Sequence, residues 1–172
     1  MNAAEELWEE LHHLFDTDDG SLPEVVFGGL GPGDLEAAFA LLRSRADPDA
    51  LAGQTVWDEQ RRADVPLADV PDAVARVADE RNPSFHVVFR ALRSEGVALP
   101  ALGVFVDPDS LALDYRMGSD WDERTLAAFV RLVGDILAVA PHATVAAVPD
   151  GGRMQYADPA FGATLRRFLA RA

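Results

Sequence analysis

The 172-residue sequence contains no cysteine and no lysine. Without cysteine the chain cannot form a disulfide, a thiolate zinc site or an iron–sulfur cluster, and it cannot use a cysteine nucleophile. Its 15 basic residues are all arginines. Together with abundant alanine, aspartate and valine, this usage is typical of a bacterial genome rich in G and C.

The sequence also lacks a long uninterrupted apolar run and a basic N-terminus. The best apolar candidate, residues 126–140, is interrupted by Arg131 and Asp135, and a span of the bilayer needs about 20 residues. The first residues carry Glu5 and Glu6 where a secretory signal peptide is positive. We therefore expect a cytoplasmic protein that does not enter a membrane.

Positive charge is scarce, since 29 acidic residues outnumber the arginines and give a net charge of −14. A phosphate backbone needs clustered basic residues, so no nucleic-acid partner is expected. Residues 1–24 hold eight acidic side chains and no basic one, whereas the C-terminal segment carries Arg166, Arg167 and Arg171. This asymmetry has two interpretations. In the first, the charges serve only solubility and the stabilisation of helix dipoles. In the second, the acidic side chains form a surface that attracts a basic protein partner.

Length and periodicity predict one domain over residues 1–172. Apolar residues at helical spacing predict helices over 4–15, 34–45, 72–79, 120–140 and 158–170. Apolar and β-branched runs predict strands over 24–27, 54–59, 85–92, 101–106, 111–117 and 144–148, with a loop over 61–71 and a turn over 149–152. The expected fold is a single α+β (α/β) domain, with a mixed, largely antiparallel sheet and helices packed mainly on one face.

The centre of the expected sheet is a hairpin around the turn 107–110. Pro108 presets the backbone for the second turn position, and residues 111–117 then alternate cleanly between apolar and polar side chains. The long helix that follows has a candidate N-cap at Ser119 or Asp120, with Glu123 three residues after Asp120 as in a capping box.

Catalytic signatures are absent from the sequence. The glycine-rich loop 28–33 lacks the third glycine of a dinucleotide-binding motif, and its Pro32 removes an amide donor. The Glu-x-x-His spacings at Glu9–His12 and Glu10–His13 lie on one helix, whereas a di-iron site needs two such helices. No serine lies in a G-x-S-x-G elbow. We expect no catalytic residue, no metal and no cofactor.

One polar surface can still be constructed on the predicted sheet. Asp114 is expected to pair with Arg116 along one face of the hairpin, and the strand over 85–92 adds His86 and Arg90. This face is either simply solvated or a surface for a partner or ligand. An enzyme would use the same four side chains, in a concave pocket.

Tryptophans among acidic residues are a second candidate for partner binding. Trp8 lies beside Glu9 on the acidic N-terminal helix, and Trp121 begins the long helix after a charged turn. An aromatic side chain ringed by carboxylates fits a contact point for a basic partner. The alternative is that both rings pack on the domain's own core.

Two further stretches resemble a known family. The first consists of Asp19-Gly20-Ser21-Leu22-Pro23 followed, about 20 residues later, by Leu42-Arg43-Ser44-Arg45. The second runs from Leu111 to Gly118 and continues with Trp121 and the helix after it. This arrangement is similar to the small α/β immunity proteins of bacterial polymorphic-toxin systems. The resemblance implies a protein that binds and neutralises a cognate toxin and has no catalytic residues.

The leading hypothesis is therefore a non-enzymatic, acidic inhibitor of a basic protein. It would act by occluding its partner, with electrostatic steering of the encounter. A secretion chaperone or adaptor is an alternative, for which we would expect an apolar groove and a homodimer. A hydrolase or transferase built on His86, Arg90, Asp114 and Arg116 is the third possibility.

Overall fold

A computed structural model describes residues 2–149 and 154–171. Its helices are α1 (Ala3–Leu11), α2 (Pro32–Ser44), α3 (Ala73–Ala78), α4 (Glu123–Val139) and α5 (Phe161–Leu169). Its main strands are β1 (Glu24–Gly28), β4 (Phe85–Phe89), β7 (Leu102–Asp107), β8 (Ser110–Tyr115) and β9 (Thr144–Val148). Two small hairpins are formed by β2 (Thr55–Asp58) with β3 (Ala63–Pro66) and by β5 (Arg93–Ser94) with β6 (Val97–Ala98). Single 3-10 turns cover His12–Leu14, Leu67–Asp69 and Met154–Tyr156.

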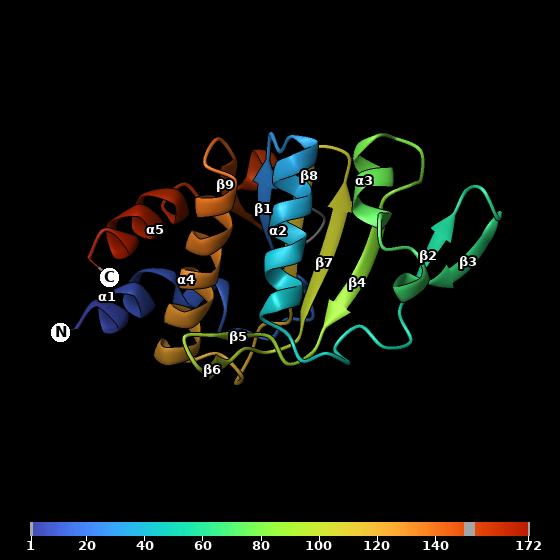
Figure 1. Ribbon diagram of the computed structural model, residues 1–172. Coiled ribbons are helices and arrows are strands. Elements are labelled where there is room, and N and C mark those ends of the chain that lie inside the picture. The colour runs from blue at the N-terminus through green and yellow to red at the C-terminus, as the bar shows by residue number, and fades with distance from the viewer. Residues whose placement is uncertain (1, 150–153, 172) are drawn as a thin grey trace.

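The five main strands form one sheet in the order β4-β7-β8-β1-β9, and every neighbouring pair is antiparallel. The β7–β8 hairpin lies at its centre and closes on the pair Asp107–Ser110. Figure 1 shows α2 and α4 lying across one face of this sheet, with α1 and α5 packed beside α4. The predicted α+β fold, with a largely antiparallel sheet, a central hairpin and helices mainly on one face, is confirmed.

The two faces of the sheet differ because side chains alternate along each strand. In β8, Leu111, Leu113 and Tyr115 are buried beneath the helices, whereas Ala112 and Asp114 remain partly exposed on the other side. The antiparallel register carries this division into the neighbouring strands. The helices therefore cover one face and leave the opposite face accessible over β4, β7 and β8, whereas Val148 of β9 is buried on that side.

An aromatic cluster joins the sheet to α4. The ring of Tyr115 stacks on Phe15 at 4.7 Å and meets Phe129 of α4 at 5.8 Å. Burial raises the pKa of the Tyr115 hydroxyl, which stays protonated and donates to the Leu14 carbonyl at 3.1 Å. Trp121 completes the cluster with 4% of its surface exposed, and its indole N–H donates to the Arg116 carbonyl at 2.8 Å. Trp121 is therefore a core residue.

The long helix begins at Glu123, three residues after the predicted start at 120. Asp122 is its N-cap, and its carboxylate accepts the Thr125 amide at 2.7 Å. The expected cap at Ser119 or Asp120 is wrong because these residues belong to a turn, closed by the bond from the Trp121 amide to the Gly118 carbonyl. That turn is what brings Trp121 into the core.

The loop predicted over residues 61–71 is wrong, because β3 and the 3-10 turn Leu67–Asp69 lie within this range. Strand β3 pairs with β2 to form a hairpin. It projects beside the main sheet (Figure 1), and β3 is almost fully exposed. The buried carboxylate of Asp58 accepts the amides of Gln60 at 2.9 Å and Arg61 at 3.2 Å. Burial opposes ionisation of Asp58, but these amides and the nearby charges of Arg76 and Arg61 outweigh it and lower its pKa. A charged turn residue thus fixes the hairpin.

The outer edge of β4 is occupied by a side chain. The Gln54 amide nitrogen donates to the Val88 carbonyl at 3.0 Å, and its oxygen accepts the Val88 amide at 3.1 Å. Gln54 therefore repeats on this edge the pair of bonds that a further strand would make.

The remaining sequence predictions concern smaller segments. The β5–β6 hairpin was not predicted, and the final helix begins at Phe161 rather than at 158. Of the turn predicted over 149–152, only Pro149 is among the described residues. Within those residues, no helix combines the length and apolar character needed to cross a bilayer.

Candidate functional site

The accessible side of the main sheet is the candidate site, and we call it the open face. It includes the outward-directed residues Glu24, Val26, His86, Val88, Phe105, Asp107, Ser110, Ala112, Asp114 and Thr144. It combines small apolar side chains with acidic groups. The solvated face of an antiparallel sheet usually carries polar side chains. This mixed composition is therefore unusual for a face that contacts only water.

A histidine–aspartate pair lies on the open face and bridges three strands. His86 is on β4 and Asp114 is on β8, with β7 between them. The ring Nε2 of His86 lies 2.6 Å from Oδ2 of Asp114. The contact is possible because Gly103 of β7 has no side chain, since a Cβ there would lie 2.1 Å from that same oxygen. The aspartate thus leans across a glycine to reach the histidine.

A concavity of about 460 Å³ lies next to this pair, over β1, β7 and β8. Its apolar surface comes from Val26, Phe105, Ala112 and Met154. Its polar lining consists of carboxylates and hydroxyls from Glu24, Asp107, Asp109, Ser110 and Thr144. Among the described residues no basic side chain lines it. The described lining of the concavity is therefore acidic and partly apolar.

Phe105 connects the two features. It lines the concavity, and its ring centroid lies 6.1 Å from that of His86. In the register it stands between His86 on β4 and Ala112 on β8, and 37% of its surface is exposed. Phe105 is therefore a surface position of the sheet and not a core position.

Two arginines predicted for the polar face lie elsewhere. Strand β8 ends at Tyr115, so Arg116 leaves the sheet and pairs with Asp18 at 3.3 Å. The expected Asp114–Arg116 pair is therefore wrong, and Asp114 contacts His86 instead. Arg90 follows the last residue of β4 and lines a separate hollow beside the loop around Asp47.

The candidate residues of the N-terminal helix belong to another surface. Trp8 is partly buried against the core, with its ring 5.9 Å from that of His12, and Glu9 is exposed. Neither lies on the open face, since α1 packs against α4 and α5. With Trp121 buried, the seven predicted partner-binding residues do not form one surface, and only His86 and Asp114 lie together on the open face.

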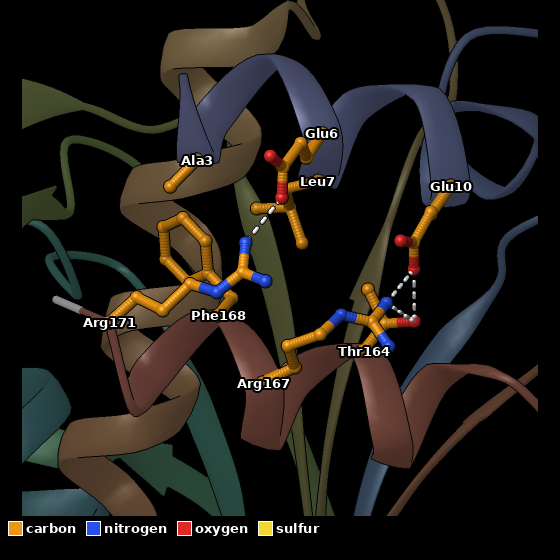
Figure 2. A pocket seen from close by; sticks show the side chains of 8 residues that line it. All are labelled: Ala3, Glu6, Leu7, Glu10, Thr164, Arg167, Phe168 and Arg171. Carbon is orange, nitrogen blue, oxygen red and sulfur yellow. Dashed lines mark hydrogen bonds and ion pairs between the residues drawn. The ribbon is translucent and has the colours of Figure 1, made fainter. Parts of the chain in front are cut away.

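The acidic N-terminal helix and the basic C-terminal helix neutralise one another in part. Figure 2 shows Arg167 of α5 and Arg171, which follows α5, reaching α1, where Arg171 pairs with Glu6 and Arg167 pairs with Glu10. The hydroxyl of Thr164 also donates to Glu10, at 2.7 Å. Part of the N-terminal acidity therefore serves the packing of α1 on α5.

Sequence reasoning missed Phe105, Asp107 and Gly103. The strand over 102–107 is apolar at nearly every position, so its own pattern does not show which side chains face outward. The signal lay in the hairpin: a two-residue turn pairs residue 107 with 110 and therefore places Phe105 opposite Ala112, on the polar side of the next strand.

The open face combines a histidine–carboxylate pair with a concavity lined by carboxylates. His86 and Asp114 have the geometry in which a carboxylate orients an imidazole, but among the described residues no hydroxyl is hydrogen-bonded to His86. The described part of the chain also contains no group of three or more histidine and carboxylate side chains placed to hold a metal ion. Comparisons with protein-family models, curated proteins and solved structures gave no match for this chain.

Proposed function

We propose that this chain is a non-enzymatic binding protein that neutralises a basic protein partner, in the manner of an immunity-type inhibitor. The observation that supports this proposal is the open face, where an apolar floor and several carboxylates line one concavity. Apolar area supplies binding free energy, and the charges select a partner of the opposite sign.

The electrostatics of the whole chain favour the same partner. A net charge of −14 attracts a basic protein over a distance and raises the rate of encounter. On the open face, the carboxylate of Asp107 accepts the hydroxyl of Ser84. This partner is neutral, so the negative charge of Asp107 remains available to an incoming cation.

The secretion-chaperone alternative includes a homodimer. Pairing two copies through the open face would bring carboxylates of both copies together, which opposes association. The enzyme alternative now depends on the His86–Asp114 pair alone, because Arg90 and Arg116 lie elsewhere. Recovery of the chain alone as a dimer distinguishes the chaperone alternative in the capture experiment.

The test is capture and neutralisation of the partner. The tagged full chain is incubated with extract of its native host, washed at low and then high salt, and the retained proteins are identified by mass spectrometry. A face variant, F105A/D107N, is compared with E36Q, which removes a charge from the exposed side of α2.

We expect one basic protein to be retained by the wild-type chain and by E36Q, and to be lost from the face variant. Expression of that protein alone should arrest growth, and co-expression of the wild-type chain should restore it. Recovery of only this chain as a dimer would support the chaperone alternative. Retention of the same partner by the face variant would exclude the open face as the docking surface.

A further inference from the structure

The ring of Phe105 lies between two carboxylates along strand β7. Asp107 is two residues further along the same strand and on the same face. In the other direction, position 103 is a glycine, and the carboxylate of Asp114 occupies the space that a side chain there would fill. Alternate residues of a strand are about 6.6 Å apart. An exposed aromatic ring thus has a negative group on either side at this spacing.

Each carboxylate is held in place by a neighbouring side chain and is partly exposed, with 17% exposure for Asp114. Oδ1 of Asp107 accepts the Ser84 hydroxyl, and Oδ2 of Asp114 contacts His86. A carboxylate has two oxygens and about four acceptor positions, so these contacts leave capacity for a further donor. The supporting contacts fix the positions of both groups before any partner arrives.

This arrangement matches the chemistry of a guanidinium group. Arginine is planar, stacks on aromatic faces and offers five N–H donors that pair with carboxylates. Lysine presents a compact, strongly hydrated charge with less affinity for a ring face. The adjoining concavity, with Val26 and Ala112 on its floor, provides room for the aliphatic part of the side chain.

We propose that the open face binds an arginine side chain of the basic partner, stacked on Phe105 between Asp107 and Asp114. The inference rests on the proposed function and specifies the chemical group that is recognised. It assigns Phe105 the role of platform, Asp107 and Asp114 the role of charge partners, and Gly103 the role of leaving room for Asp114.

The experiment is a titration of the isotope-labelled full chain with a blocked Gly-Arg-Gly peptide, followed by NMR at about physiological salt. Blocked Gly-Lys-Gly and Gly-Gln-Gly peptides are the controls. We expect the arginine peptide to shift backbone amides of β7 and β8 around Phe105, the lysine peptide to bind several-fold more weakly, and the glutamine peptide to produce no shift.

Variants test the two halves of the site. F105L keeps apolar area but removes the ring, and D107N removes one charge. Each should weaken peptide binding about two- to fivefold, as expected for an exposed cation–π contact or ion pair. E36Q, which makes the same charge change on α2, should bind like the wild-type chain. Each variant is first checked for an unchanged pattern of amide signals outside β7 and β8.

Equal binding of the lysine peptide, shifts spread over all acidic surfaces, or unchanged binding by both F105L and D107N would overturn the inference. Loss of the partner from the face variant without peptide binding would overturn the arginine site and leave the proposed function standing. Peptide binding at Phe105 without any captured partner would support the arginine site and overturn the proposed function.

Discussion

The two faces of the main sheet are built from the same strands and have opposite characters. On the covered face, Leu113 and Tyr115 are almost fully buried beneath α4 and its neighbours. On the open face, Phe105 remains 37% exposed, and Asp114 reaches across Gly103 to His86. A period of two residues is enough to separate a surface that stabilises the domain from a surface suited to recognition.

This comparison shows where substitutions should affect folding and where they should affect binding. A buried leucine contributes through packing, so its loss leaves a cavity. A half-exposed side chain on the open face contributes little to the core, and its exposed area is available to a partner.

The largest effect is expected on the covered face. L113A should lower the free energy of unfolding by about 3 kcal/mol, because Leu113 is completely buried in the middle of β8. F105A removes a larger side chain from the open face and should lower it by only about 1 kcal/mol. Urea unfolding of both variants measures the difference, and equal losses would show that the two faces do not differ in this way.

The helix layer can be weakened at its start. D122A should lower the free energy of unfolding by about 1 kcal/mol, because the Thr125 amide loses its acceptor. D120A is the matched control and should have little effect, since Asp120 lies in the preceding turn. A larger loss from D120A than from D122A would show that Asp122 is not the N-cap.

The same cap predicts a pH dependence. The Thr125 amide lowers the pKa of Asp122 below its ordinary value of 3.8. The ionised cap therefore contributes stability above about pH 4, and the contribution is lost as the pH falls through the lowered pKa. D122N keeps a side-chain acceptor without a charge, so its unfolding free energy should fall less than that of the wild-type chain between pH 5 and about pH 2, as measured by urea unfolding.

Gly103, which lies beneath the Asp114 carboxylate, is the next position at which the open face can be altered. G103A places a methyl group where the Asp114 carboxylate lies, so the carboxylate must move and its contact with His86 should break. We expect a loss of about 1 kcal/mol and a changed His86 imidazole signal in NMR. In a D114A background the same glycine substitution should cost clearly less, and an undiminished cost would locate the clash elsewhere.

The smallest effect is expected at the pairs between α1 and α5. E10Q removes the charge that meets Arg167, yet both side chains are more than one-third exposed. The loss should be under about 1 kcal/mol and should shrink at high salt. E9Q changes an exposed neighbour on the same helix and should leave thermal unfolding unchanged. A large effect of E10Q would give these pairs a main part in packing the termini.

The helices and main strands could be predicted because each has a strong local pattern. Residues 111–117 alternate cleanly, and residues 126–140 carry one continuous apolar stripe. Strand β3 could not be predicted in this way, because it is exposed and lacks a buried face that would enforce alternation. Its pairing depends on the buried turn carboxylate of Asp58, a tertiary feature that local pattern does not show.

The candidate site was predictable only in part, since it depends on which strands become neighbours. His86 and Asp114 were assigned to the polar face, but their contact requires β7 between them and a glycine at position 103. Arg116 was assigned to the same face because the alternation continues past Tyr115, whereas the strand ends there. The partner strand determines where a hydrogen-bonded ladder ends, and the alternation of residues along one strand does not predict it.

The amide of Gln54 has a consequence for the behaviour of the protein at high concentration. By filling the bonding positions of Val88, it blocks lateral growth of the sheet at the β4 edge. A strand from a second molecule would have to displace two hydrogen bonds there before it could add to the sheet. At the β4 edge the chain can therefore keep a partly apolar sheet face in contact with water while resisting the addition of a strand from a second molecule.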